Sequence, residues 1–152
     1  MRSWASATPE VRAGWRHGAC VAAAALWWGS LTTTGFMVVP LLFAYLPSPA
    51  LAGQTAARLF TAQAWVALGC GLLLVLLTRS RPAGASRALP YVLAGMLLAM
   101  LVEFAIAPRI LARENLRLWH SAGTGMYLLQ WLCAGVALWR TAAHTPRSAG
   151  PS

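Results

Sequence analysis

The chain of 152 residues contains no lysine and no aspartate, and charged residues make up only 10% of it. All of its positive charge comes from twelve arginines, which face the three glutamates Glu10, Glu103 and Glu114 and leave a formal net charge of +9. Typical soluble domains are about a quarter charged. So few charges in a chain that is 59% apolar indicate a membrane protein.

Catalytic and redox motifs are also missing from the sequence. There is no GxSxG, no HExxH and no phosphate-binding loop, and the three carboxylates cannot supply an acid/base pair within one bundle. The three cysteines, Cys20, Cys70 and Cys133, lie in apolar stretches without CxxC spacing. We therefore expect no enzymatic activity and no disulfides, and we interpret the cysteines as small buried residues.

Long apolar runs are what the sequence does contain. A bilayer core about 30 Å thick needs roughly 20 apolar residues per helix. Four runs meet this requirement, at about residues 18–45, 56–78, 89–107 and 119–140, and residues 141–152 are expected to form a disordered polar tail. The predicted fold is a single all-α integral membrane domain over residues 1–152, a four-transmembrane-helix up-down bundle.

Local signals place the ends of these runs. Thr8-Pro9-Glu10 favours the start of a helix, Leu46-Pro47-Ser48-Pro49 predicts a turn, and the chain is expected to reverse near Glu114 and Asn115. A secretory signal peptide cleaved after Ala50-Leu51-Ala52 is the alternative for the first run. That run is about twice as long as the 7 to 15 residues that such a signal uses. We therefore interpret it as a membrane span.

The positions of the arginines predict the orientation. Eight lie in the N-terminal segment, the middle loop and the tail, against four in the other two loops. The positive-inside rule then places both termini in the cytoplasm, for a multi-pass protein of the inner membrane. Arginines at the ends of apolar runs are typical of topology signals, so nucleic acid is not expected as a partner. The exception is the last loop, where Arg109, Arg113 and Arg117 are predicted to contact an acidic partner or lipid headgroups.

Several polar side chains fall at similar depth in the leaflet away from the cytoplasm, and they form the candidate polar site. The set consists of Glu103, His120, Thr124, Tyr127, Gln63 and Thr33, with Thr32 and Thr34 beside it. His120, Thr124 and Tyr127 follow helical spacing and are expected to face the bundle interior. Glu103, about four residues from the predicted end of its helix, is expected either to pair with Arg109 or Arg113 or to bind a ligand or proton.

Two alternatives stay open for His120. It is interpreted either as a hydrogen-bonding group between helices or as a ligand of copper or haem iron. Met96 and Met100, one turn apart, could add soft ligands for copper(I), although methionines in apolar helices more often serve packing. No cofactor is predicted, and copper or haem is the alternative.

The chain resembles small bacterial membrane proteins that carry domain of unknown function 4149 and are similar to eukaryotic transmembrane protein 205. The resemblance spans about residues 18–140 and rests on Gly35-Phe36 leading to Pro40, Ala52-Gly53, Leu59-Phe60, Pro108, Leu118-Trp119-His120 and Tyr127-Leu128-Leu129-Gln130. It implies a four-span bundle with a histidine at the head of the last helix, here His120, and no established reaction. That family is also similar to copper-resistance and haem-biosynthesis proteins that use histidines in the bundle.

Three functions are therefore considered. The first is an accessory or interaction protein, surrounded by membrane lipid and bound to a membrane-protein partner or to further copies of itself. The second is a metal- or haem-handling protein that uses His120. The third is a small oligomeric transporter with Glu103 in its pathway.

Overall fold

The computed structural model describes residues 9–78, 87–112 and 115–143. These residues form helices and turns, without a strand among them. The elements in chain order are α1 (Pro9–Thr33), η2 (Thr34–Val38), α2 (Val39–Tyr45), α3 (Pro49–Thr78), α4 (Leu89–Leu101), η4 (Val102–Ile106), α5 (Ala107–Leu111) and α6 (Leu116–Ala142). Thr8, the loop arginines Arg79 and Arg81, and nearly all of the predicted tail lie outside the described residues.

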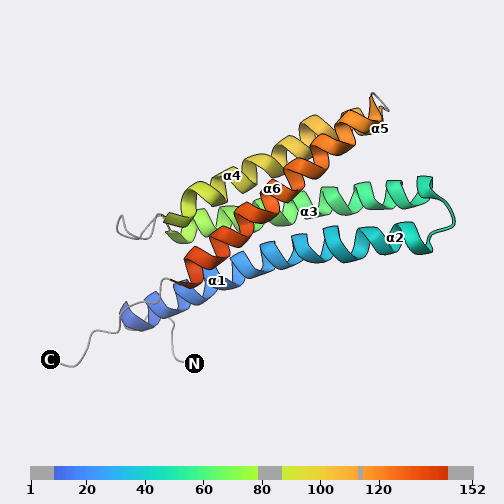
Figure 1. Cartoon of the computed structure of the whole chain (residues 1–152). Helices are drawn as coiled ribbons and strands as arrows, with labels where there is room; N and C mark the ends of the chain where they lie inside the picture. The colour runs from blue at the N-terminus through green and yellow to red at the C-terminus, as the bar shows by residue number, and fades with distance from the viewer. Residues whose placement is uncertain (1–8, 79–86, 113–114, 144–152) are drawn as a thin grey trace.

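The helices form two long hairpins that pack together (Figure 1). In the first, α1, η2 and α2 run one way and α3 returns; in the second, α4, η4 and α5 run one way and α6 returns. In the packed half, α1 and α4 each contact both α3 and α6. The predicted all-helical class is confirmed.

Three helical stretches are long and apolar enough to cross a membrane: Val11–Tyr45, Pro49–Thr78 and Leu89–Leu111. The fourth predicted span lies in α6, which has 27 residues but does not reach the same apolarity. His120, Thr124 and Gln130 interrupt its apolar stretch. The structure therefore supports three candidate spans directly.

Prolines account for two boundaries that differ from the prediction. The second span starts at Pro49 rather than near residue 56, because proline suits the first position of a helix and Ser48 caps it, with its Oγ accepting from Leu51 N–H at 3.3 Å. The third span does not end beside Pro108 but continues to Leu111. A π-helical turn before the proline makes this continuation possible.

Each hairpin contains one such π-helical turn, followed by a proline. In η4, Ala107 N–H donates to Val102 O, five residues back, and residue 108 has no N–H to donate. The main-chain carbonyl of Glu103 therefore accepts neither of the usual helical hydrogen bonds, because Ala107 N–H is directed to Val102 O and Pro108 has no N–H. In η2, Val39 N–H donates in the same way to Thr34 O, ahead of Pro40.

The core lies where the four long helices meet. Its largest fully buried side chains are Trp27, Leu31, Leu74 and Cys20, surrounded by alanines that let the helices approach. Gly95 is one of these close approaches, since an added Cβ would lie 2.7 Å from the ring of Trp27. The three cysteines are buried, as expected for small apolar side chains.

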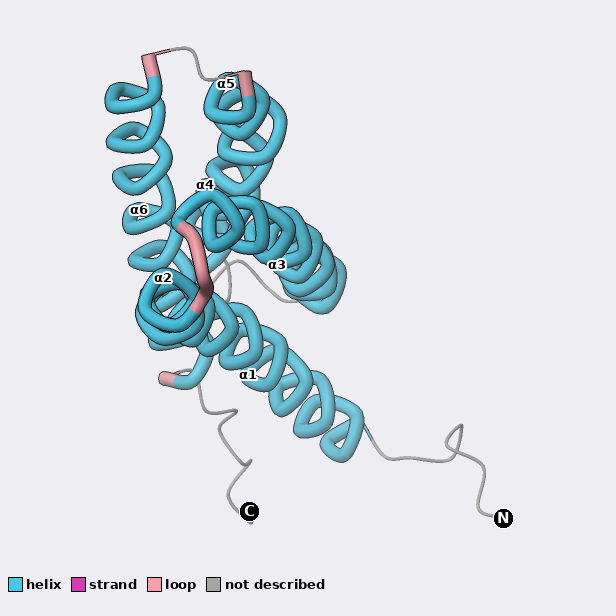
Figure 2. The backbone as a smooth tube through the Cα atoms, turned by 90° about the vertical axis from the view of Figure 1, so that its right-hand side faces the viewer, coloured by secondary structure: helices cyan, strands magenta, loops and turns pink. Residues whose placement is uncertain are grey.

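The two hairpins separate toward the end of the molecule that carries the α2–α3 turn. There α2 packs mainly on α3, while α5 packs on η4 and α6. Figure 2, turned by 90° from Figure 1, shows the same divergence of the α5–α6 end from the α2–α3 end. Side chains on this half of α6 consequently have fewer helices to pack against.

Candidate functional site

Gln63 is the centre of a buried hydrogen-bond network between the helices of the first hairpin. Its Nε2 donates to Ser30 Oγ at 3.0 Å, and its Oε1 accepts from Thr34 Oγ1 at 3.3 Å. Ser30 Oγ in turn donates to Trp27 O at 2.9 Å. Only 6% of Gln63 is exposed, so this network satisfies an amide that would otherwise be costly to bury.

The three consecutive threonines divide between two faces of the helix. Thr34 contacts Gln63, and Thr32 Oγ1 accepts from Trp131 Nε1 at 2.9 Å. Thr33, the residue chosen from the sequence, is exposed. Successive helical residues point about 100° apart, so three in a row cannot all face one interior. Thr33 therefore points away from the Gln63 network, and its place in a polar site stays a prediction.

Glu103 lies in η4 and accepts a hydrogen bond across the interface between the hairpins. Thr61 Oγ1, on α3, donates to Glu103 Oε1 at 2.9 Å. Because the helix continues to Leu111, Glu103 is eight residues from its end rather than four, or about 12 Å along the axis. The carboxylate is half-buried.

The predicted ion pair between Glu103 and Arg109 is absent from the described part of the chain. The Arg109 guanidinium instead lies over the ring of Trp119, with its carbon 4.3 Å from the ring centroid. Arg113, the other proposed partner, lies outside the described residues. Arg109 and Arg117 are exposed, as predicted for arginines of the last loop.

The polar face of α6 is only partly turned inward. Tyr127 hydroxyl donates to Leu31 O at 2.7 Å, and its ring packs edge-on against Phe60 with centroids 5.3 Å apart. His120 and Thr124 are exposed, and Thr124 bonds only within its own helix, to His120 O at 2.9 Å. The prediction that all three face the interior is wrong for His120 and Thr124, because the hairpins have separated at that level.

The two π-helical turns are related by a short repeat that the sequence analysis missed. Phe36 to Pro40 and Phe104 to Pro108 both follow the pattern F-x-[VI]-x-P, and both phenylalanines are exposed. Each turn also lies against a hydroxyl-bearing side chain from the second helix of the other hairpin. Tyr127 of α6 reaches Leu31 and lies against Gly35, while Thr61 of α3 reaches Glu103. The repeat marks both π-helical turns in the sequence, but nothing in it points to Thr61.

Gln130 is a second buried amide, and it is not satisfied in the same way. Only 3% of it is exposed, and its Nε2 has no hydrogen-bond partner in the described part of the chain. The same holds for Trp27 Nε1 and His17 Nδ1. Leaving such donors unpaired inside a protein costs about 1–3 kcal/mol each. The sequence analysis used Gln130 only as part of the family resemblance.

Metal-ligating side chains do not gather among the residues that the structure describes. No group of three His, Cys, Asp or Glu side chains close enough to hold a metal ion occurs there. A copper or haem role for His120 stays a prediction from the sequence.

A family model described as "Domain of unknown function (DUF4149)" matches residues 22–118. The matched segment contains both π-helical turns, Gln63, Thr61 and Glu103. The match ends at residue 118. His120 and Tyr127, which the sequence resemblance included, therefore lie outside it. A comparison with curated proteins and with solved structures finds no match.

Proposed function

The chain belongs to the DUF4149 family, whose function is unknown, and we propose that it is a four-span inner-membrane protein that takes up a proton at Glu103 inside the bilayer. The Thr61–Glu103 contact, deep in a candidate span and without a described cationic partner, carries this proposal.

The fourth span is α6, for a reason of length and position. Trp119 and Trp139 are twenty residues apart on it, or about 30 Å, which equals the thickness of the hydrocarbon core. Tryptophan is enriched at both membrane interfaces. Arg117 and Arg140 lie just outside this pair, and α6 packs along α1 and α4. Because α6 packs along α1 and α4, it crosses the bilayer together with them.

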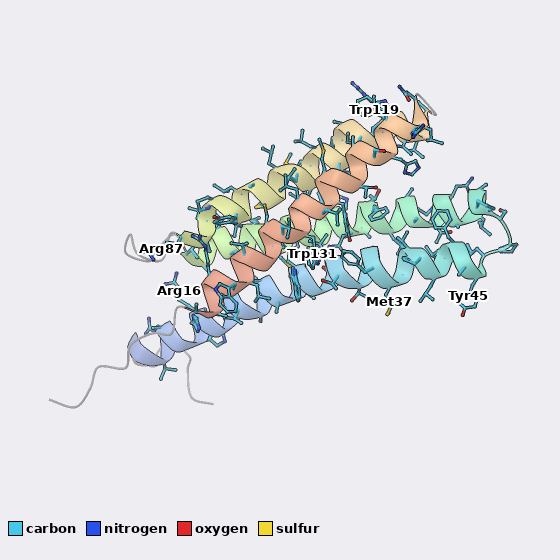
Figure 3. All side chains as sticks on the ribbon, in the orientation of Figure 1. Arg16, Met37, Tyr45, Arg87, Trp119 and Trp131 are labelled. Carbon is cyan, nitrogen blue, oxygen red and sulfur yellow. The ribbon has the colours of Figure 1, made fainter. Side chains whose placement is uncertain are left out.

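The orientation follows from the arginines. The start of α1 and the end of α6 lie at the same end of the bundle (Figure 1), as four spans require. Arg16 and Arg87 are also at that end, opposite Tyr45 and Trp119 (Figure 3). The excess of arginine at this end supports a cytoplasmic location for it, and with it for both termini.

Glu103 is suited to proton transfer because it is a carboxyl group in a candidate span with no described cationic partner. A carboxylate inside a bilayer is costly unless it is paired, and carboxyl groups in spans commonly serve as proton relays. Among the described residues Glu103 has a hydroxyl partner but no arginine. Binding a proton removes the charge, while Thr61 can still donate to the carbonyl oxygen of the neutral acid.

The π-helical turn adds a second acceptor at the same residue. The main-chain carbonyl of Glu103 lacks its helical donors, since Ala107 N–H is directed to Val102 O and Pro108 has no N–H. π-Helical turns are frequent at functional sites. A free carbonyl beside a carboxyl can hold a water that passes the proton on. We infer proton transfer by Glu103, in a homo-oligomer that completes the pathway a single small bundle has little room for.

Infrared difference spectroscopy tests this proposal directly, because the chain has only three acidic side chains. The full-length protein in liposomes should give a carboxyl C=O band that appears as the pH falls, and one component of that band should be absent in Glu103→Gln. Glu10→Gln and Glu114→Gln, outside the spans, are the matched controls and should keep it. Liposomes with a trapped pH dye should show proton flux that Glu103→Gln alone abolishes.

The isosteric amide can still accept from Thr61, so Glu103→Gln should fold. A band that is unchanged in Glu103→Gln, or an equal proton flux in wild type and Glu103→Gln, would refute the proposal.

An accessory or interaction protein is the second candidate, favoured by one observation. The exposed Arg109 is held over Trp119, which presents a fixed cation on the outer side. An acidic membrane-protein partner would fit this surface. Joint replacement of Arg109 and Arg117 by glutamine should then reduce co-purification of that partner.

A further inference from the structure

Arg140, in the last turn of α6, is held in place by the start of the second hairpin. Its Nη1 donates to Arg87 O at 3.1 Å, and its Nη2 donates to Tyr91 Oη at 3.3 Å. The guanidinium carbon also lies 4.7 Å from the Tyr91 ring centroid. A guanidinium has five N–H donors, so these contacts orient it and leave donors for a ligand.

Two arginines line one hollow at this end of the bundle. Arg87, Trp139, Arg140 and Ala143 surround about 260 Å³. Glu103, the one acidic side chain that the structure describes, is in η4, in the other half of the bundle. The hollow therefore has the charge of an anion site, and arginine pairs are well suited to phosphate.

A second hollow adjoins the first and is apolar. It is a shallow depression of about 250 Å³, open to the surface and lined by Trp28, Trp131, Leu132, Gly135, Val136 and Trp139. Trp139 belongs to both hollows and is 76% exposed. Gly135 keeps this groove open beside Trp28, because an added Cβ would lie 3.0 Å from Trp28 Nε1.

The two hollows together run from the interface into one leaflet. Ala143, at the end of α6, and Trp139, Val136 and Leu132 on α6 follow each other at helical spacing along one stripe. From Trp139 at the interface to Leu132 the stripe extends about 10 Å, roughly two thirds of the depth of one leaflet, which is about 15 Å. The basic end lies at the interface and the apolar part runs toward the midplane.

We propose that these adjoining hollows bind one phospholipid with an anionic headgroup. Arg87 and Arg140 hold the phosphate, Trp139 lies at the level of the glycerol, and an acyl chain runs along α6 against Trp28 and Trp131. Basic pockets between spans on the cytoplasmic side bind anionic headgroups in this way. The inference rests on α6 being a span and does not depend on proton uptake by Glu103.

Native mass spectrometry of the detergent-purified full-length protein, titrated with phosphatidylglycerol, tests this site. Arg87→Gln removes an exposed cation, and it should weaken binding about tenfold, the worth of one charged hydrogen bond. Arg58→Gln, an equal loss of charge at the opposite end, is the matched control and should bind as wild type does. Helical content and thermal unfolding of Arg87→Gln should be unchanged.

The choice of ligand tests the headgroup and the chain separately. Long-chain phosphatidylglycerol should bind more tightly than zwitterionic phosphatidylcholine, than short-chain phosphatidylglycerol and than inorganic phosphate. Equal binding of phosphatidylcholine would overturn the anionic headgroup, and equal binding of inorganic phosphate would overturn the lipid. If Arg58→Gln lost as much phosphatidylglycerol affinity as Arg87→Gln, the loss would reflect the net charge of the protein, and the proposed site would be overturned.

Discussion

Gly35 should be one of the positions where the bundle is least tolerant of an added methyl group. It lies in η2 directly beneath the ring of Tyr127. A Cβ there would lie 2.6 Å from Tyr127 Cε1 and 3.1 Å from the phenol oxygen. The ring cannot simply swing away, because its hydroxyl donates to Leu31 O at 2.7 Å and its edge packs on Phe60. Gly35→Ala should therefore destabilise the protein.

The expected cost can be worked out from these contacts. Overpacking costs about 1–3 kcal/mol, and losing the Tyr127 hydrogen bond costs about 1 kcal/mol. Replacing a helical glycine by alanine returns about 1 kcal/mol of conformational entropy and propensity. The net loss is then roughly 1–3 kcal/mol. Gly29→Ala in α1, with nothing within 4 Å of the added Cβ, is the matched control and should be neutral or slightly stabilising.

The free energy of unfolding of both variants can be measured in mixed micelles with increasing SDS, followed by tryptophan fluorescence. Pairing Gly35→Ala with Tyr127→Ala provides the double-mutant cycle, and the cost of the glycine substitution should nearly vanish when the ring is absent. Equal stabilities for Gly35→Ala and Gly29→Ala, or a cost that persists without the ring, would show that the Gly35–Tyr127 contact does not constrain the bundle.

Two further substitutions test contacts between the hairpins by the same unfolding assay. Thr32→Val removes the acceptor of Trp131 Nε1 and should cost about 1–2 kcal/mol, since the indole N–H is left unpaired; an unchanged stability would mean that another group accepts it. Gly95→Ala places a Cβ 2.7 Å from the fully buried ring of Trp27 and should cost up to about 2 kcal/mol, after the gain of about 1 kcal/mol for replacing a helical glycine is subtracted. Gly69→Ala, with open space around it, is its control and should cost nothing.

Local chemistry along the chain was enough to predict the all-helical class, three candidate spans and two of the turns. Apolar length identified the spans, and prolines and short polar stretches identified the turn before Pro49. The reversal expected near Asn115 is also observed, and Asn115 has the left-handed backbone (φ 34°) that asparagine tolerates better than most residues. Each of these features depends on neighbours in sequence, which is why they could be predicted without a fold.

The composition of the polar site could be predicted only in part. Glu103, Gln63 and Tyr127 were found because a polar residue in an apolar run is conspicuous wherever it points. Thr61, the partner of Glu103, was missed because a threonine on α3 carries no such signal. The F-x-[VI]-x-P repeat would have marked the two π-helical turns, but its meaning depends on the helices that pack against them.

Tertiary packing settled which polar groups meet. The π-helical turn carries the helix past Pro108 and puts Glu103 about a turn deeper than expected. Separation of the hairpins leaves His120 and Thr124 exposed while Tyr127, one turn further along, is packed. Helix rotation and separation depend on how side chains such as Tyr127 and Trp27 pack against glycines far away in the sequence. The length of an apolar run in the sequence determines how far a helix can extend, but it does not determine which other helices pack against each of its faces.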